Sequence, residues 1–174
     1  YNLVSGFWIH DTGSDGLVLS GGAHHNVLEH ALVENTGWDG VYIVEAHDNT
    51  FHSISAENVP DDGWDIEYST GNVFDTVWAY SVSDGFDMEA STDNLFSNVE
   101  VGWSRQDAYI LYSGSSDNTF IDVRAREASY AGIIIEESGG NCFYGARVAG
   151  SGWDPMIGIY LWMADGTTFV DTRI

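Results

Sequence analysis

The segment DDGWDIEYSTGNVFDTVWAYSVSDGFDMEASTDNLF, residues 61–96, contains nearly the same phrase twice. DDGWDIE at 61–67 returns as SDGFDME at 83–89, with Asp, Gly, an aromatic residue, Asp, an aliphatic residue and Glu in the same order. Recurrence at a period of about 20 to 50 residues is typical of solenoids and other repeat architectures. The phrase therefore predicts that each copy forms one structural unit stacked on the next.

Two signals carry this period along the whole chain. One is an Asp-Gly pair at residues 15, 39, 62 and 84, which weakens to Asp107-Ala108 and Ala131-Gly132. The other is an Asn that precedes an apolar or Thr residue and then a large hydrophobic one, at Asn2, Asn26, Asn49, Asn72, Asn94, Asn118 and Asn141. The steps between these asparagines are 24, 23, 23, 22, 24 and 23 residues, and Thr167 begins a degenerate eighth copy. We expect the asparagines to form a ladder of side-chain amides, each preceded by a residue suited to positive φ angles.

Within each repeat the hydrophobic pattern is that of short strands. The first and third residues after Asp-Gly are apolar in most copies, as in Leu17/Leu19, Val41/Ile43 and Phe86/Met88. Such alternation, interrupted by Gly, Asn, Asp and Ser, predicts strands with one buried face, and no helix of useful length is indicated. A single repeat cannot bury its apolar face, so stacked repeats must share one core, as in a parallel β-solenoid.

The Asn-x-Phe and Asp-Gly-hydrophobic repeats resemble the right-handed parallel β-helix repeat of the pectin-lyase-like superfamily. The resemblance covers essentially the whole chain and implies an all-β, single-stranded parallel β-helix of about seven turns. We expect residues 1–174 to form one domain, which can also be a segment of a longer chain. Because this superfamily includes polysaccharide lyases, hydrolases, epimerases, phage tailspikes and non-catalytic surface proteins, the resemblance specifies the fold more closely than the function.

The charge of the chain restricts its partners. It contains 5 basic and 27 acidic residues, a net charge of −22, and its basic residues are all arginine. Such a charge argues against binding to nucleic acid or to an anionic membrane surface, and no stretch is apolar enough to span a bilayer. It suits a salt-rich setting or a cation-binding surface, and we expect an extracellular or cell-surface location. The single cysteine, Cys142, excludes an internal disulfide.

The repeated phrase also concentrates acids on the outward rows of the coil. We expect one outward row to contain Val18, Tyr42, Asp65, Asp87, Tyr109 and Ile134. Asp65, Glu67, Asp87 and Glu89 would then form an acid square on two neighbouring turns, framed by Tyr42 and Tyr109. Like charges one strand apart repel, so they either raise a pKa or bind a cation. The acid square is therefore a predicted metal site, with Ca²⁺ as the expected ion because it prefers carboxylate oxygens.

Two other interpretations of these acids remain open. The Asp-Gly aspartates can simply cap turns by accepting backbone N–H groups, which is a common role of Asp. The resemblance implies instead a reaction centre on sugars, with Asp65 and either Asp84 or Asp87 as acid and base and Arg105 as the nearby basic residue. The Gly-His-Gly and Arg-x-Lys elements of the related hydrolases are missing, and Glu67 stands where the epimerases have histidine.

Aromatic residues and histidines give two further candidates. Trp38, Trp103 and Trp153 precede the Asp-Gly position, and exposed aromatic planes can stack on sugar rings or pack against a neighbouring subunit. The predicted substrate-binding residues are Tyr42, Tyr109, Trp38 and Trp103. The alternative is that they cover local loops. His24 and His47 should stack on adjacent turns, either as a two-histidine metal site or as exposed turn residues.

These observations predict an extracellular structural or surface β-helix whose acidic and aromatic face binds cations or polysaccharide. Neither end of the sequence contains a recognisable capping helix, so we expect copies to stack end to end into a filament. The alternative prediction is a polysaccharide-processing enzyme, a uronan hydrolase, lyase or C5-epimerase, centred on Asp65, Asp84 and Asp87.

Overall fold

A computed structural model describes residues 1–150 and 157–174, and these residues form an all-β solenoid without helices. The strands are β1 (Leu3–Ser5), β2 (Trp8–His10), β3 (Leu17–Leu19), β4 (Val27–Glu34), β5 (Val41–Val44), β6 (Thr50–Glu57), β7 (Trp64–Glu67), β8 (Val73–Asp75), β9 (Trp78–Tyr80), β10 (Phe86–Glu89), β11 (Leu95–Ser97), β12 (Glu100–Gly102), β13 (Tyr109–Tyr112), β14 (Thr119–Ile121), β15 (Arg124–Arg126), β16 (Ala131–Glu136), β17 (Cys142–Tyr144), β18 (Arg147–Ala149), β19 (Ile157–Trp162) and β20 (Thr168–Val170). In the described part of the chain, no helix has the length and hydrophobicity needed to cross a membrane. Trp153 lies outside the described residues.

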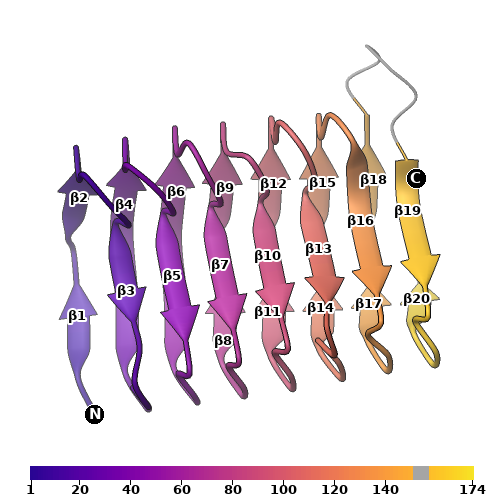
Figure 1. Ribbon diagram of the computed structural model, residues 1–174, viewed down its shortest axis with the longest axis horizontal. Coiled ribbons are helices and arrows are strands. Elements are labelled where there is room, and N and C mark those ends of the chain that lie inside the picture. Colours follow the sequence, from indigo (N-terminus) through magenta and orange to yellow (C-terminus); the bar gives the residue numbers. More distant parts are fainter. Residues whose placement is uncertain (151–156) are drawn as a thin grey trace.

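The strands form two parallel sheets that run the length of the coil. Sheet B contains seven strands, one per turn, in the order β19-β16-β13-β10-β7-β5-β3, and sheet A contains the remaining thirteen. Each strand pairs in register with the equivalent residues one turn later, for example Phe86 with Trp64. Figure 1 shows the turns following one another in sequence order along the long axis, from indigo to yellow. The predicted parallel β-solenoid of about seven turns is therefore confirmed.

The core consists of columns of side chains, one from each turn. The phenylalanines of the Asn-x-Phe signal stack with ring centroids 4.3–5.0 Å apart, in the order Phe51, Phe74, Phe96, Phe120, Phe143 and Phe169. A second column from sheet B contains Trp64, Phe86 and Tyr109. Burial of a large apolar side chain contributes about 1.5–3 kcal/mol, so these columns account for much of the driving force that holds the turns together.

The asparagine row forms the predicted amide ladder. The Asn94 side-chain nitrogen donates to the Asn118 side-chain oxygen at 3.1 Å, and the same bond links every consecutive pair from Asn2 to Asn141. The residue before each asparagine from Asn26 to Asn141 adopts positive φ, as at Asp48 (55°) and Gly71 (68°). Because the amides pair with one another and with backbone groups, these buried polar side chains remain satisfied.

The structure corrects one predicted row. Tyr109 pairs with Phe86 and is fully buried, so it belongs to the inward column and does not frame the acid square. In this turn Asp107-Ala108 replaces Asp-Gly, which makes Tyr109 the first residue after the pair and Ile110 the second. The outward neighbours of Asp87 and Glu89 are therefore Ile110 and Tyr112. Tyr109 donates its hydroxyl to the carbonyl oxygens of Val99 and Arg124, and burial prevents it from contacting a substrate.

Candidate functional site

The acid square lies on the outer face of sheet B. Strands β7 and β10 pair in register, which sets Asp65 beside Asp87 and Glu67 beside Glu89. Strand alternation turns Trp64, Ile66, Phe86 and Met88 into the core and leaves all four acids partly exposed on the outside. Adjacent parallel strands are roughly 4.8 Å apart, so two pairs of like charges stand within one strand spacing.

A second row of acids runs along the turn that precedes sheet B. The Asp62 carboxylate accepts the backbone N–H of Asp84 at 3.1 Å, and the Asp84 carboxylate accepts that of Asp107 at 2.7 Å. Asp15 and Asp39 make the same bond to the next turn. These aspartates therefore form a ladder that caps the turns, as the structural interpretation predicted. Asp84 is committed to this ladder through one of its oxygens.

The two rows of acids are close enough to change each other's ionisation. Burial, assisted by neighbouring carboxylates, raises the pKa of Asp65 to about 8 and that of Asp87 to about 7. Burial also raises the pKa of Asp62 and Asp84, and the negative charge of Asp84 raises that of Asp62 further. The pKa of Asp84 is raised less, because the backbone N–H of Asp107 and the neighbouring Asp62 oppose the effect of burial.

The glutamates of the acid square accept hydrogen bonds from two tyrosines, Tyr42 in strand β5 and Tyr68 just after strand β7. Tyr42 donates its hydroxyl to Glu67 at 3.0 Å, and Tyr68 donates to Glu89 at 3.3 Å. One oxygen of Asp87 is buried without a hydrogen-bond partner. The face therefore contains carboxyl groups in different states, some bound by hydroxyls and one incompletely satisfied, next to exposed aromatic rings.

The carboxylates that converge most closely are not those of the acid square. Among the described residues, the group whose oxygens all lie within 4.8 Å of one another consists of Asp39, Asp61 and Asp62. From the sequence we expect Asp39 and Asp62 in the row of Asp-Gly aspartates, without joining them to Asp61. The proximity of Asp39 and Asp62 could have been predicted from the repeat, since both are Asp-Gly aspartates. The position of the Asp61 carboxylate depends on the conformation of its turn.

Arg105 lies beside this group rather than over the acid square. Its guanidinium donates to the carbonyl oxygens of Val59 and Pro60, on the turn that leads to Asp61. Its positive charge lowers the pKa of Asp84 only as a minor influence. The side chain thus holds a turn through backbone contacts, which does not orient it as a proton abstractor.

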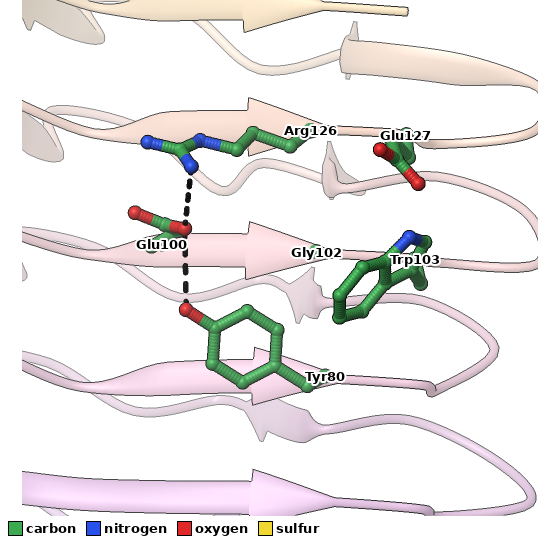
Figure 2. A pocket seen from close by; sticks show the side chains of 6 residues that line it. All are labelled: Tyr80, Glu100, Gly102, Trp103, Arg126 and Glu127. Atoms are coloured by element: carbon green, nitrogen blue, oxygen red, sulfur yellow. Dashed lines mark hydrogen bonds and ion pairs between the residues drawn. The ribbon is translucent and has the colours of Figure 1, made fainter. Parts of the chain in front are cut away.

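The two described tryptophans of the predicted binding set occupy different surroundings. Trp38 is 63% exposed and immediately precedes Asp39, so it lies next to the group of three aspartates. Trp103 is 60% exposed but lines a separate pocket of about 110 Å³ outside sheet A, with Tyr80, Glu100, Gly102, Arg126 and Glu127 (Figure 2). Figure 2 shows Glu100 between Tyr80 and Arg126, and its oxygen accepts the Tyr80 hydroxyl at 3.2 Å. Sequence reasoning did not detect this pocket.

The stacked histidines are confirmed as neighbours. His24 and His47 form a parallel bridge on adjacent turns, and the Nδ1 atoms of His24 and His25 lie 2.8 Å apart. The Nδ1 atom of His47 is buried without a hydrogen-bond partner.

Comparison with known proteins gives a family for this chain. Residues 4–171 match the family model described as periplasmic copper-binding protein (NosD). The chain belongs to the NosD family. No curated protein matches this NosD-family chain.

Several solved structures share the fold of the chain at low sequence identity. The A-module of the Azotobacter vinelandii mannuronan C-5 epimerase AlgE4 has a TM-score of 0.82 at 9% identity, with 96% of this chain and 57% of that chain covered. The periplasmic alginate epimerase AlgG, as a T265N mutant, has a TM-score of 0.74 at 16% identity, covering 98% and 42%. The catalytic domain of a GH87 α-1,3-glucanase in complex with nigerose has a TM-score of 0.69 at 20% identity, covering 98% and 40%. The chain thus spans 40–57% of the length of these structures, which demonstrate a shared parallel β-helix fold.

Proposed function

We propose that this NosD-family chain is a polysaccharide-binding β-helix of the periplasm or cell exterior, and that the outer face of sheet B binds the sugar. The observation that carries the proposal is the acid face, by which we mean the acids on the outer side of sheet B and on the turn before it. There Asp65 lies beside Asp87, and the group of Asp39, Asp61 and Asp62 precedes strands β5 and β7 of that sheet. The exposed ring of Trp38 directly precedes Asp39. Sugars are recognised by aromatic planes that stack on the ring and by polar groups that bind hydroxyls. Carboxyl groups with raised pKa supply both donors and acceptors near neutral pH.

The charge of the face favours neutral sugar units. A net charge of −22 repels polyanions, and the sheet B acids repel them locally. Ca²⁺ is the ion expected from the sequence for the acid square. We propose it instead for the group of Asp39, Asp61 and Asp62, whose oxygens converge and can together bind such an ion. A bound cation would favour the ionised carboxylates and release protons from the face.

Binding can be tested by calorimetric titration with neutral glucan oligosaccharides, with and without Ca²⁺. The Trp38→Ala variant should weaken binding at least several-fold, since stacking on the exposed indole is lost. Trp8→Ala is the matched control, because Trp8 is 62% exposed on sheet A, away from the acid face. Unchanged affinity in Trp38→Ala, or equal loss in both variants, would contradict the proposed site.

A polysaccharide-processing activity is the second candidate, favoured by Asp62 and Asp84 on adjacent turns. The Asp84 backbone N–H donates to the Asp62 carboxylate at 3.1 Å, and burial raises the pKa of both carboxyl groups. In a hydrolysis, a protonated carboxyl would protonate the glycosidic oxygen while a carboxylate removes a proton from the attacking water. Hydrolysis of the same oligosaccharides should then yield new reducing ends. With uronic-acid polymers as substrates, lyase activity should yield unsaturated products and epimerase activity should yield epimerised residues. An Asp65→Asn/Asp87→Asn double variant that retains such activity would exclude the acid square, whereas loss in Asp62→Asn alone would implicate the pair.

Copper binding is a further candidate because of the family description. Imidazole nitrogens suit copper, and His24, His25 and His47 bring such nitrogens together on two adjacent turns. Titration with Cu²⁺, followed by electron paramagnetic resonance, should reveal nitrogen ligands that disappear in His24→Asn/His25→Asn and persist in His10→Asn. A copper signal with oxygen ligands alone would contradict the histidine site.

A further inference from the structure

The arginines are distributed very unevenly. The chain contains five basic residues, and four of them lie in the outward rows of sheet A on its last turns. These four residues are here named the basic strip: Arg124, Arg126, Arg147 and Arg173. The fifth, Arg105, is bound to backbone carbonyls near Asp61. A protein with 27 acidic residues therefore concentrates its positive charge on one part of its surface.

The fold does not require this arrangement. Arg124 pairs directly with Arg147 in the sheet, and Arg147 forms a bridge with Arg173 one turn later. Earlier turns place Ser55, Trp78 and Glu100 in the same row, so the position accepts many residue types. Like charges directly opposite each other on adjacent strands are destabilising. An anion that bridges successive arginines would remove this repulsion.

Part of the strip is internally neutralised and part is not. Glu100 lies 3.5 Å from the guanidinium nitrogens of both Arg124 and Arg126. Within residues 1–150 and 157–174, no carboxylate lies within 4.0 Å of the Arg147 or Arg173 guanidinium. Arg147 and Arg173 are exposed and line a pocket together with Tyr144 and Gly145. Asp122 and Asp171 line the same pocket. Gly145 stands between them in its row, and a Cβ atom there would meet the Asp122 carboxylate at 2.6 Å.

Hollows with aromatic walls therefore lie at both ends of the strip. The Arg147 and Arg173 pocket includes Tyr144, which is 43% exposed. The pocket in Figure 2 includes Arg126 and the exposed Trp103. The side chains between them repeat at the strand spacing, roughly 4.8 Å. A ligand that fits must be extended, carry an anionic group at a comparable repeat, and present flat faces to aromatic rings.

From this arrangement we infer that the basic strip binds a linear acidic polysaccharide, with carboxylates of successive sugar units bound by Arg124, Arg147 and Arg173 and sugar faces stacked on Tyr144 and Trp103. Carboxylates match the planar guanidinium in bidentate fashion. Single-stranded nucleic acid is the competing linear polyanion, because arginine also binds phosphates. Asp122, Asp171 and Glu127 interrupt the strip and limit its positive charge. Those same carboxylates can accept sugar hydroxyls. The strip lies on sheet A, so the inference does not depend on the proposed function of sheet B.

The test is titration of the whole chain with oligogalacturonate at low salt, with dextran and single-stranded poly(dT) as comparison ligands. Arg124→Gln/Arg147→Gln should bind oligogalacturonate at least about tenfold more weakly, because charge-assisted hydrogen bonds to two sugar units are lost. Arg105→Gln removes a charge elsewhere and should bind like the unaltered chain. Arg124→Lys/Arg147→Lys retains the charge and should recover only part of the affinity.

Each outcome decides the inference. Selective loss in the Arg124→Gln/Arg147→Gln variant, with circular dichroism unchanged, supports it. No binding of oligogalacturonate, equal loss in Arg105→Gln, or a preference for poly(dT) overturns it. The Asp65→Asn/Asp87→Asn variant separates the two proposals, since it should retain binding of oligogalacturonate even where neutral oligosaccharides no longer bind.

Discussion

At the scale of single residues, the stability of the fold depends on buried polar side chains that repeat at each turn. Asn118 is fully buried, and its side chain donates to the carbonyl of Ser91 at 2.9 Å while its oxygen accepts the backbone N–H of Asn94 at 2.9 Å. The acid face works in the opposite sense, because burial there penalises charge. Hydrogen bonds thus offset the cost of burying the neutral amides, whereas partial burial of the carboxyl groups disfavours their ionised form.

Replacing Asn118 by Ala should destabilise the fold. The change leaves the N–H of Asn94 and the carbonyl of Ser91 without partners. Each such buried group costs about 1–3 kcal/mol. Chemical unfolding should therefore show a clear decrease in the free energy of unfolding. Thr119→Ala is the control, since Thr119 points outward on the same strand and should change stability little. Equal effects of the two substitutions would contradict the importance of the amide ladder.

The free energy of unfolding should decrease as the pH rises from about 4 to about 8. Burial raises the pKa of Asp65 from 3.8 to about 8, so the folded state holds a proton that the unfolded state has released in this range. The contribution is fully present below the unfolded pKa and is lost as the pH approaches the folded one. Asp87, raised to about 7, acts in the same direction.

Asp65→Asn should flatten this pH dependence and stabilise the protein at pH values above about 8, because the buried charge can no longer form. Urea unfolding at several pH values measures both effects. Asp117→Asn makes the same charge change at an exposed turn and should leave the slope unaltered. A free energy of unfolding that rises with pH in the unaltered protein would contradict the raised pKa values.

At the scale of elements, the spacing between neighbouring turns is limited by close backbone and side-chain contacts at the glycines of the Asp-Gly pairs. A Cβ atom on Gly85 would meet a Val101 methyl and the Ala108 carbonyl oxygen at 2.4 Å. In the next turn Ala108 takes the glycine position, and the residue equivalent to Val101 is the smaller Ala125. The side-chain size tolerated at the glycine position therefore depends on the side-chain size at the position of Val101 and Ala125.

Gly85→Ala should destabilise the protein by about 1–3 kcal/mol through overpacking. Val101→Ala alone should also destabilise it, by leaving a cavity. The double variant should be more stable than the sum of the two effects predicts, by about 1 kcal/mol or more, because it reproduces the Ala108 and Ala125 arrangement. Chemical unfolding of all four proteins measures the coupling. Simple additivity would show that the contact does not limit the turn spacing, and Gly13→Ala, which meets no atom within 4 Å, is the steric control.

At the scale of the whole molecule, the net charge of −22 is the dominant property. Self-repulsion between so many carboxylates opposes compaction, and salt screens it over a distance of about 8–10 Å at moderate ionic strength. End-to-end stacking of copies, an extracellular location and binding of Ca²⁺ also belong to this scale, and they stay predictions.

The midpoint of thermal unfolding should therefore rise as NaCl is increased from millimolar to molar concentrations. Calorimetry in NaCl and in matched sucrose separates charge screening from a general effect of excluded cosolutes. Most of the rise should occur at low ionic strength, where the Debye length changes most. A midpoint that is constant or falls with salt would show that the acids are already compensated locally.

Most of the fold could be predicted from the sequence because a solenoid makes vertical neighbours of residues about one period apart. The 22-residue step between the two copies of the repeated phrase was enough to place Asp65 beside Asp87. The error at Tyr109 arose where Asp107-Ala108 weakens the repeat signal. Tyr109 directly follows this pair, as Phe86 follows Asp84-Gly85, so it continues the inward column and Ile110 continues the outward row. Periodicity could not reveal the Arg105 contact with Val59 and Pro60, which crosses two turns.

The sequence by itself determined the all-β coil, the asparagine ladder, the inward columns and the rows of acids, because each depends only on period and strand alternation. Only the tertiary structure decided which acids converge, as Asp39, Asp61 and Asp62 do, and how hollows form around Trp103 and along the basic strip. The physical reason is that backbone pairing fixes the height and face of every residue. The meeting of side chains across a turn depends on loop conformation and rotamers, which no repeat encodes.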